Sequence, residues 1–158
     1  MKMYYSTCYS SPVGELLIVS DDEAICEVHF QKQKDFHNYN EDSILLDKAC
    51  GWFDDYFQGK NPKINFKLKT EGTVFQEKVW KILTLIPYGK TLTYGDIASK
   101  ISKTMSAQAV GGAVGHNPIA ILIPCHRVLG VKGKLTGYSA GLDKKMDLLD
   151  LEKIKYFK

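Results

Sequence analysis

The sequence predicts an α+β fold in two parts: an N-terminal antiparallel β-sheet with a helix over residues 1–70, and an all-helical C-terminal part over residues 71–158. Two patterns lead to this prediction. Short runs rich in Tyr, Val and Ile alternate with turn residues between Met3 and Phe30, which is typical of strands joined by hairpins. After Gly72, apolar residues recur at helical spacing behind residues that cap helices.

Three strands are expected at the start of the chain, over residues 3–10, 15–20 and 24–30. Turn residues at 11–14 and 21–22 separate these three runs. Because connections this short favour neighbouring antiparallel strands, we expect a meander.

One helix is expected to follow the sheet. Residues 31–42 are polar and loop-like, and Ser43 is a good N-cap for the apolar stripe that comes after it. Gly59 and Pro62 would end this helix, and residues 64–68 could return to the sheet as a strand. The stripe consists of Leu45, Leu46, Ala49, Trp52, Phe53, Tyr56 and Phe57.

Two longer helices are expected near the ends of the C-terminal part. Thr73 would cap the first, which stops at Pro87-Tyr88-Gly89, and the last would cover residues 142–155 and present Glu152. Their inward faces are formed by Phe75, Val79, Trp80, Leu83 and Ile86 in the first, and by Met146, Leu149 and either Leu148 or Leu151 in the last.

Between them, two short helices are expected over residues 94–102 and 107–114, capped by Thr93 and Ser106. Two short helices with a tight break between them fit a helix-turn-helix. The pair Gly111-Gly112 weakens the second helix by about 1 kcal/mol per glycine relative to alanine. Small residues fit where another backbone comes close, either that of a neighbouring helix or that of a ligand.

The net charge of +3 hides an uneven distribution. Residues 1–70 carry 8 Lys against 11 Asp and Glu, a net charge of −3, whereas residues 71–158 carry 13 Lys and Arg against 7 Asp and Glu, a net charge of +6. A basic half would attract a phosphate backbone, and it also fits an ordinary solvated surface.

Location and metal content can be judged from a few absences in the sequence. No apolar run approaches the ~20 residues of a membrane span, and the first residues lack a secretory signal, so we expect an intracellular protein with no membrane partner. The cysteines at 8, 26, 50 and 125 are scattered, which favours free thiols. Residues 26–29 have the spacing of half a zinc site, but a structural site needs four ligands, and no metal is expected.

The stretch with most chemistry is residues 121–128. An apolar run enters the core, Pro124 halts it, and Cys125, His126 and Arg127 follow at once. A thiol is nucleophilic as the thiolate, and adjacent imidazole or cationic groups favour that form. From spacing alone, a reactive nucleophile and a buried structural cysteine beside a surface His-Arg pair are both possible.

A wider set of motifs decides between these two. Residues 117–118 leading into 121–128 resemble the active-site signature of the O6-alkylguanine-DNA alkyltransferases, the methylated-DNA–protein-cysteine methyltransferase family. The resemblance covers residues 74–152, about half the chain, and implies an RNase H-like N-terminal part with a winged-helix-like DNA-binding part. The further matching motifs are Thr93-Tyr94-Gly95, Ala109-Val110-Gly111-Gly112-Ala113, Gly137-Tyr138-Ser139-Ala140-Gly141-Leu142, Leu148-Leu149 and Glu152.

This resemblance implies a repair reaction at one cysteine. Cys125 would attack the alkyl carbon and keep the alkyl group as a thioether, and His126 would draw the thiol proton through water. Glu152 would hold the imidazole, as the third member of a catalytic triad does. Tyr94 would bind the flipped base and donate a proton to it, and Asn117 would fix the turn at the site. No cofactor is needed, and each molecule would act once.

The resemblance also implies how DNA is held. The partner would be double-stranded DNA containing O6-alkylguanine, bound through its minor groove by a monomer in the cytoplasm and nucleoid. Relatives usually carry an arginine where this chain has Gln108, which brings no charge and less reach, so slower or weaker extrusion of the base is expected. The expected DNA contacts are Tyr94, Ser106, Ala107, Gln108, Ala109 and Gly111, and the expected substrate pocket is Val128, Tyr138, Ser139 and Ala140.

Three other functions fit parts of the pattern. A non-catalytic module that recognises alkylated DNA would lack the acceptor cysteine that is present here at Cys125. A winged-helix regulator would explain residues 94–114 but would leave Cys125 and His126 without a role. A Cys-His hydrolase would need an oxyanion hole, for which the sequence offers no motif.

Overall fold

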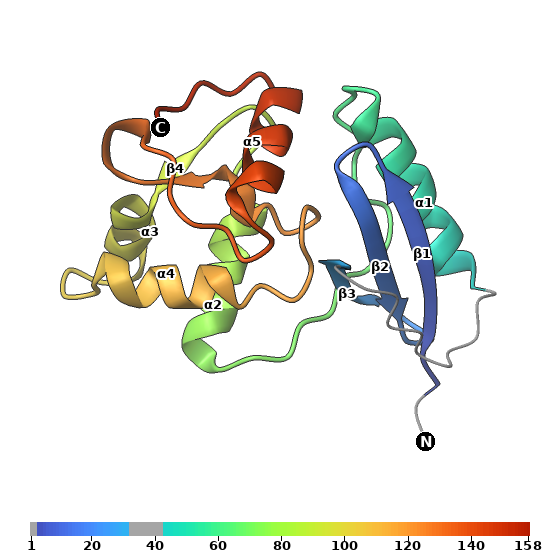
Figure 1. Cartoon of the computed structure of the whole chain (residues 1–158). Helices are drawn as coiled ribbons and strands as arrows, with labels where there is room; N and C mark the ends of the chain where they lie inside the picture. The colour runs from blue at the N-terminus through green and yellow to red at the C-terminus, as the bar shows by residue number, and fades with distance from the viewer. Residues whose placement is uncertain (1–2, 32–42) are drawn as a thin grey trace. The chain divides into compact units, whose positions relative to one another are not determined.

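The computed structural model describes residues 3–31 and 43–158. They form two compact units, one built from Met1–Thr70 with Pro118–Leu122 and the other from Glu71–Asn117 with Ile123–Lys158 (Figure 1). The predicted mixed α+β class is confirmed. Among the helices that the structure describes, none combines the length and the apolar character needed to cross a membrane.

The first unit contains the predicted meander. Strands β1 (Tyr5–Ser11), β2 (Gly14–Ser20) and β3 (Ile25–Phe30) pair antiparallel in that order. In the central strand every residue from Leu16 to Ser20 is buried, so this strand supplies much of the apolar core of the unit.

Two segments without regular secondary structure form backbone hydrogen bonds with the outer edge of β3. Ile25 exchanges backbone hydrogen bonds with Lys67 and Lys69, and Val28 does so with Pro118 and Ala120. The strand expected over residues 64–68 was wrong, since only Leu68 there forms a single parallel bridge. The pairing with residues 67–69 cannot continue along β3, because the segment at residues 118–120 bonds the same edge at Val28.

Helix α1 (Ile44–Phe57) contacts the sheet with its aromatic residues, and its start and end agree with the prediction. Ser43 has the N-cap position, but its side chain makes no capping hydrogen bond, so the capping role expected from its residue type was wrong. Its φ of −153° is more extended than that of the three N-caps of the second unit that do make such bonds. Most of the loop expected over residues 31–42 lies outside the described residues.

The second unit contains four α-helices: α2 (Val74–Thr84), α3 (Tyr94–Ile101), α4 (Ala107–Gly115) and α5 (Leu142–Leu151). Thr73 and Thr93 each complete a capping box, and Ser106 accepts a hydrogen bond from the third residue after it, as predicted. Helix α5 ends four residues before the predicted end, because Glu152 becomes its C-cap and Lys153 turns to a φ of +59°.

The second unit also contains a short parallel pair, β4 (Leu92–Thr93) and β5 (Val128–Leu129), so the expectation of an all-helical part was too simple. Runs of two residues are too short to produce a period of two in the sequence. Two 3-10 turns, η1 (Cys125–Arg127) and η2 (Val131–Gly133), flank β5. This pairing places η1, with the predicted nucleophile, directly before a buried strand.

Candidate active site

The segment that leads to the site is tightly folded. The backbone N–H of Leu122 donates to the carbonyl of Ala120 at 2.8 Å, which leaves Ile121 between them at a φ of +69°. A β-branched residue rarely adopts positive φ, and such a conformation costs on the order of 1–3 kcal/mol. The side chain of Ile121 is fully buried, so packing holds this conformation in place.

A second tight turn presents Cys125. Its N–H donates to the carbonyl of Ile123 at 2.8 Å around Pro124, whose φ and ψ of −80° and 66° are those of an inverse γ-turn. The amide Nδ2 of Asn117 donates to the same Ile123 carbonyl at 2.7 Å. Asn117 therefore fixes the backbone immediately before the cysteine.

The thiol of Cys125 is almost completely buried, with 4% of the residue exposed. Burial raises the pKa of this thiol, while hydrogen bonds with the side chains of Asn117 and Tyr138 and the charge of Lys145 lower it. Because burial dominates, the thiol keeps its proton in the resting protein. Its activation needs a base.

His126 is the adjacent residue and is fully buried. Its Nε2 lies 2.5 Å from Oε2 of Glu152. Burial lowers the pKa of the imidazole, and the hydrogen bond and charge of Glu152 oppose that shift without reversing it. His126 is therefore a neutral imidazole that can accept a proton at neutral pH.

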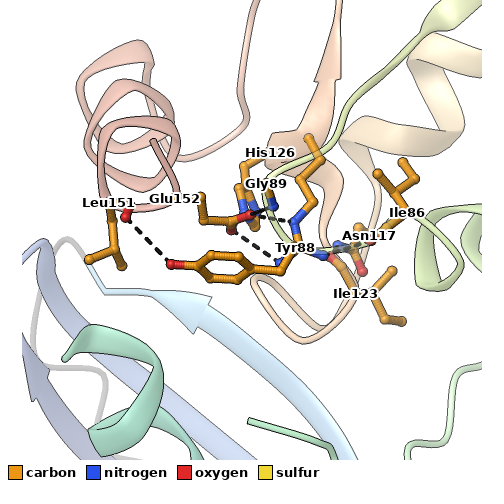
Figure 2. Close-up of polar contacts among 9 residues, drawn as sticks. Ile86, Tyr88, Gly89, Asn117, Ile123, His126, Leu151 and Glu152 are labelled. Carbon is orange, nitrogen blue, oxygen red and sulfur yellow. Dashed lines mark hydrogen bonds and ion pairs between the residues drawn. The ribbon is translucent and has the colours of Figure 1, made fainter. Parts of the chain in front are cut away.

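The carboxylate of Glu152 accepts hydrogen bonds from three directions (Figure 2). Besides His126, it accepts from Nε of Arg127 at 2.8 Å, from Nη2 of Arg127 at 3.2 Å and from the N–H of Gly89 at 3.0 Å. Arg127, the only arginine in the sequence, is 8% exposed and also donates to the carbonyl of Ile86 at 2.7 Å. Because Arg127 balances the charge of Glu152, the pair leaves little net charge to stabilise an imidazolium, which agrees with a neutral His126.

The contact from Gly89 depends on a turn that only glycine adopts easily. The N–H of Lys90 donates to the carbonyl of Pro87, and Gly89 between them has a φ of +77°. The hydroxyl of Tyr88 in the same turn donates to the carbonyl of Leu151 at 3.5 Å, as Figure 2 shows. The turn thus contacts the end of α5 at two points, next to Glu152.

Cys125 opens onto a cavity of about 260 Å³ within the second unit. Tyr94 at the start of α3 lies on one wall, and a Cβ added at Gly111 of α4 would meet its ring at 3.8 Å. The small residues of α4 therefore leave room beside the tyrosine. The cavity is lined by Tyr94, Gly111, Val114, Gly115, Cys125, Gly137, Tyr138 and Ser139.

Lys145 is a buried residue of the site that the sequence reasoning missed. It is 0% exposed, and its Nζ donates to the carbonyls of Thr136 at 3.2 Å and Gly137 at 3.4 Å and to Oγ1 of Thr136 at 3.4 Å. Burial lowers its pKa to about 8, and the electrostatic interaction with the thiolate form of Cys125 opposes that shift. Its spacing from Leu148 and Leu149 is helical, so a lysine within the apolar stripe of α5 was the available signal.

The structure brings several predicted site residues together and separates others. Cys125, Tyr94, Tyr138, Ser139 and Gly111 line the cavity. Asn117, His126 and Glu152 are not among the lining residues: Asn117 bonds the turn before the cysteine, and His126 and Glu152 pair with each other. Val128 is fully buried in β5, and neither it nor Ala140 is among the lining residues. The residues at the exposed start of α4 are Ser106, Ala107, Gln108 and Ala109.

Among residues 3–31 and 43–158, no three His, Cys, Asp or Glu side chains are grouped so that they could hold a metal ion.

Comparison with known proteins assigns both halves of the chain. Residues 74–154 match a family described as 6-O-methylguanine DNA methyltransferase, DNA binding domain. Residues 3–70 match a family described as 6-O-methylguanine DNA methyltransferase, ribonuclease-like domain.

Individual relatives give the same result over the whole length. The chain is 45% identical to a methylated-DNA–protein-cysteine methyltransferase of Haemophilus influenzae, across 99% of this chain and 90% of that protein. It is 44% identical to one of Methanosarcina acetivorans, across 95% and 98%. The crystal structure of Mycobacterium tuberculosis OGT in complex with DNA matches with a TM-score of 0.84 and 40% identity, across 96% and 92% of the two chains.

Proposed function

This chain belongs to the 6-O-methylguanine DNA methyltransferase family, and from that membership we propose that it repairs DNA by transferring the alkyl group of O6-alkylguanine to its own Cys125. The observation that carries this assignment is the surroundings of Cys125. A buried thiol lines a cavity that Tyr94 also lines, and the next residue, His126, is paired with Glu152.

The reaction would be a single displacement at the alkyl carbon. A bond forms from Sγ of Cys125 to that carbon while the bond from the carbon to O6 breaks, and the electron pair of that bond leaves with guanine. The thiol proton goes to Nδ1 of His126, directly or through a water, because Nε2 is engaged by Glu152. The leaving guanine takes a proton from Tyr94, which regains one from the solvent.

The supporting residues would hold the base in the right form. Glu152 engages Nε2 of His126, and Arg127 and Gly89 fix Glu152, so Nδ1 is the ring nitrogen that would accept the proton. Asn117 orients the turn that carries Cys125. Since a thioether is not hydrolysed by any of these groups, each molecule would react once.

We assign DNA binding to the region of residues 71–158 and a supporting role to residues 1–70. The exposed start of α4 carries small side chains and Gln108, which suit close approach to the minor groove of a duplex. The nucleotide must rotate out of the helix to reach a cavity of about 260 Å³, which would accept a single base. We propose a monomer that acts on DNA in the cytoplasm.

Mass spectrometry of the intact protein tests the assignment, after mixing with duplex DNA that contains one O6-methylguanine. One added methyl group per molecule is expected, located by peptide mapping on Cys125 and absent from a Cys125→Ala variant. Cys8, Cys26 and Cys50 are internal controls that should stay unmodified. DNA binding without any transfer would instead support a module that only recognises the lesion.

A further inference from the structure

Each N–H donor of the Lys145 ammonium group has a hydrogen-bond acceptor. An ammonium has three N–H donors and no acceptor. In the second unit these three donors meet three acceptors: the carbonyl oxygens of Thr136 and Gly137 and the hydroxyl oxygen of Thr136. Because this buried cation can only donate, every group that it contacts must act as a hydrogen-bond acceptor toward it.

That direction continues through Thr136. Its Oγ1 accepts from Lys145, and its hydroxyl hydrogen donates to the hydroxyl oxygen of Tyr94 at 3.1 Å. A phenol oxygen that accepts from Thr136 still has its own hydrogen to donate. Tyr94 lines the cavity with Cys125, so this remaining donor can be aimed at a molecule bound there.

We propose that Thr136 is a positioning residue. Because its hydroxyl oxygen accepts from Lys145, its hydroxyl hydrogen donates to the oxygen of Tyr94, and the phenol O–H of Tyr94 is thereby turned toward the substrate base. This inference rests on the proposed function, in which Tyr94 gives a proton to the leaving guanine. Without the threonine hydroxyl, the O–H of Tyr94 is free to rotate, and a bound base meets it in the correct orientation for only part of the time.

Two further features agree with this role. Burial raises the pKa of Tyr94, although the hydrogen bond from Thr136 lowers it, so the phenol keeps its proton at neutral pH. Nζ of Lys145 lies 6.0 Å from the centre of the Tyr94 ring, within the range of a cation–π contact. This contact helps to hold the ring of Tyr94 beside the ammonium group of Lys145.

A pair of variants isolates the hydroxyl. Thr136→Val keeps the shape of the side chain and removes the hydroxyl, and Thr136→Ser keeps the hydroxyl. A positioned proton donor contributes about 10²–10⁴-fold to a rate. Thr136→Val leaves the O–H of Tyr94 in place and disturbs only its orientation. We therefore expect this variant to slow methyl transfer from duplex O6-methylguanine DNA by roughly 5- to 20-fold. Thr136→Ser should stay within about twofold of the parent.

Two readouts separate this role from a merely structural one. The reaction of Cys125 with iodoacetamide, followed by peptide mass spectrometry, expels iodide and needs no proton donor, so its rate should be unchanged in Thr136→Val. In a Tyr94→Phe background, Thr136→Val should add no further loss, because both changes remove the same step.

Each alternative result overturns the inference. A transfer rate unchanged in Thr136→Val, equal losses in Thr136→Val and Thr136→Ser, a parallel loss of iodoacetamide reactivity, or additive losses with Tyr94→Phe would each do so. In all four cases the unmodified chain still methylates Cys125, so the proposed function stands. If the unmodified chain transfers no methyl group, the proposed function fails first.

Discussion

Replacing Lys145 by methionine should make the protein more stable and less active. A lysine whose pKa falls from 10.5 to about 8 on folding contributes about 3 kcal/mol of unfavourable free energy to the native state at neutral pH, at about 1.4 kcal/mol per pKa unit. Lys145→Met removes this contribution. It also removes three hydrogen bonds, to the carbonyl and hydroxyl oxygens of Thr136 and the carbonyl of Gly137, worth about 1 kcal/mol each, but Gly137 is exposed and water can replace the donor there.

The sign of the pH dependence follows from proton binding. Between pH 8 and pH 10.5, the unfolded chain keeps the proton on Lys145 while the native protein releases it. The stability of the unmodified protein therefore gains from this group as the pH rises through that interval, and it has the full penalty below pH 8. Lys145→Met should be more stable by about 1–3 kcal/mol at pH 7, and this advantage should shrink by about 3 kcal/mol near pH 10.5.

Urea unfolding followed by tryptophan fluorescence at pH 7, 8.5 and 10 measures this difference, with reductant present to protect the thiols. Lys81→Met, on the exposed surface of α2, is a matched control that should leave the pH dependence unchanged. A difference between Lys145→Met and the unmodified chain that is the same at all three pH values would contradict a lowered pKa of Lys145 in the native protein. So would a Lys145→Met variant that loses more than about 2 kcal/mol at pH 7.

Three further predictions concern the site. Arg127→Met leaves the buried Glu152 without its charge partner and should lower the free energy of unfolding by about 3–5 kcal/mol in urea; adding Glu152→Gln should recover part of the loss, and no recovery would contradict the account. Because burial lowers the pKa of His126, the unfolded chain binds a proton on this residue before the native protein does as the pH falls below about 6.5. The free energy of unfolding should therefore fall with the pH in the unmodified protein and less steeply in His126→Gln. Equal slopes in the two proteins from pH 7.5 to 5.5 would count against a lowered pKa of His126. Gln108→Arg should raise the single-turnover repair rate on duplex DNA, since arginine brings charge and reach, and an unchanged rate would exclude a role in extruding the base.

Local structure could be predicted where the signals are local. Thr73 and Thr93 each precede a helix and find their partners three residues later, so residue type and spacing were enough to place both caps. Ser43 shows the limit of that reasoning. It stands at the correct position, but its side chain makes no capping bond, because backbone geometry as well as residue type decides that contact.

The site could be predicted only in part from the sequence, because its supporting contacts come from distant parts of the chain. Adjacent positions and the family motif indicated Cys125 and His126, but the N–H of Gly89 reaches Glu152 from 63 residues away. Lys145 was missed for a different reason. A lysine is normally placed on the solvated face of a helix, and only the fully packed surroundings of α5 show that this one is buried.

The two segments that bond the outer edge of β3 have a consequence for the synthesis of this protein on the ribosome. Residues 67–69 are available as soon as residues 1–70 have been translated, but Val28 must wait for Pro118 and Ala120, about ninety residues later. Until then the edge of β3 presents free main-chain groups that could pair with another nascent chain. We therefore expect a fragment that ends at Thr70 to aggregate, and chaperones to be most useful during the interval before the segment at residues 118–122 is made.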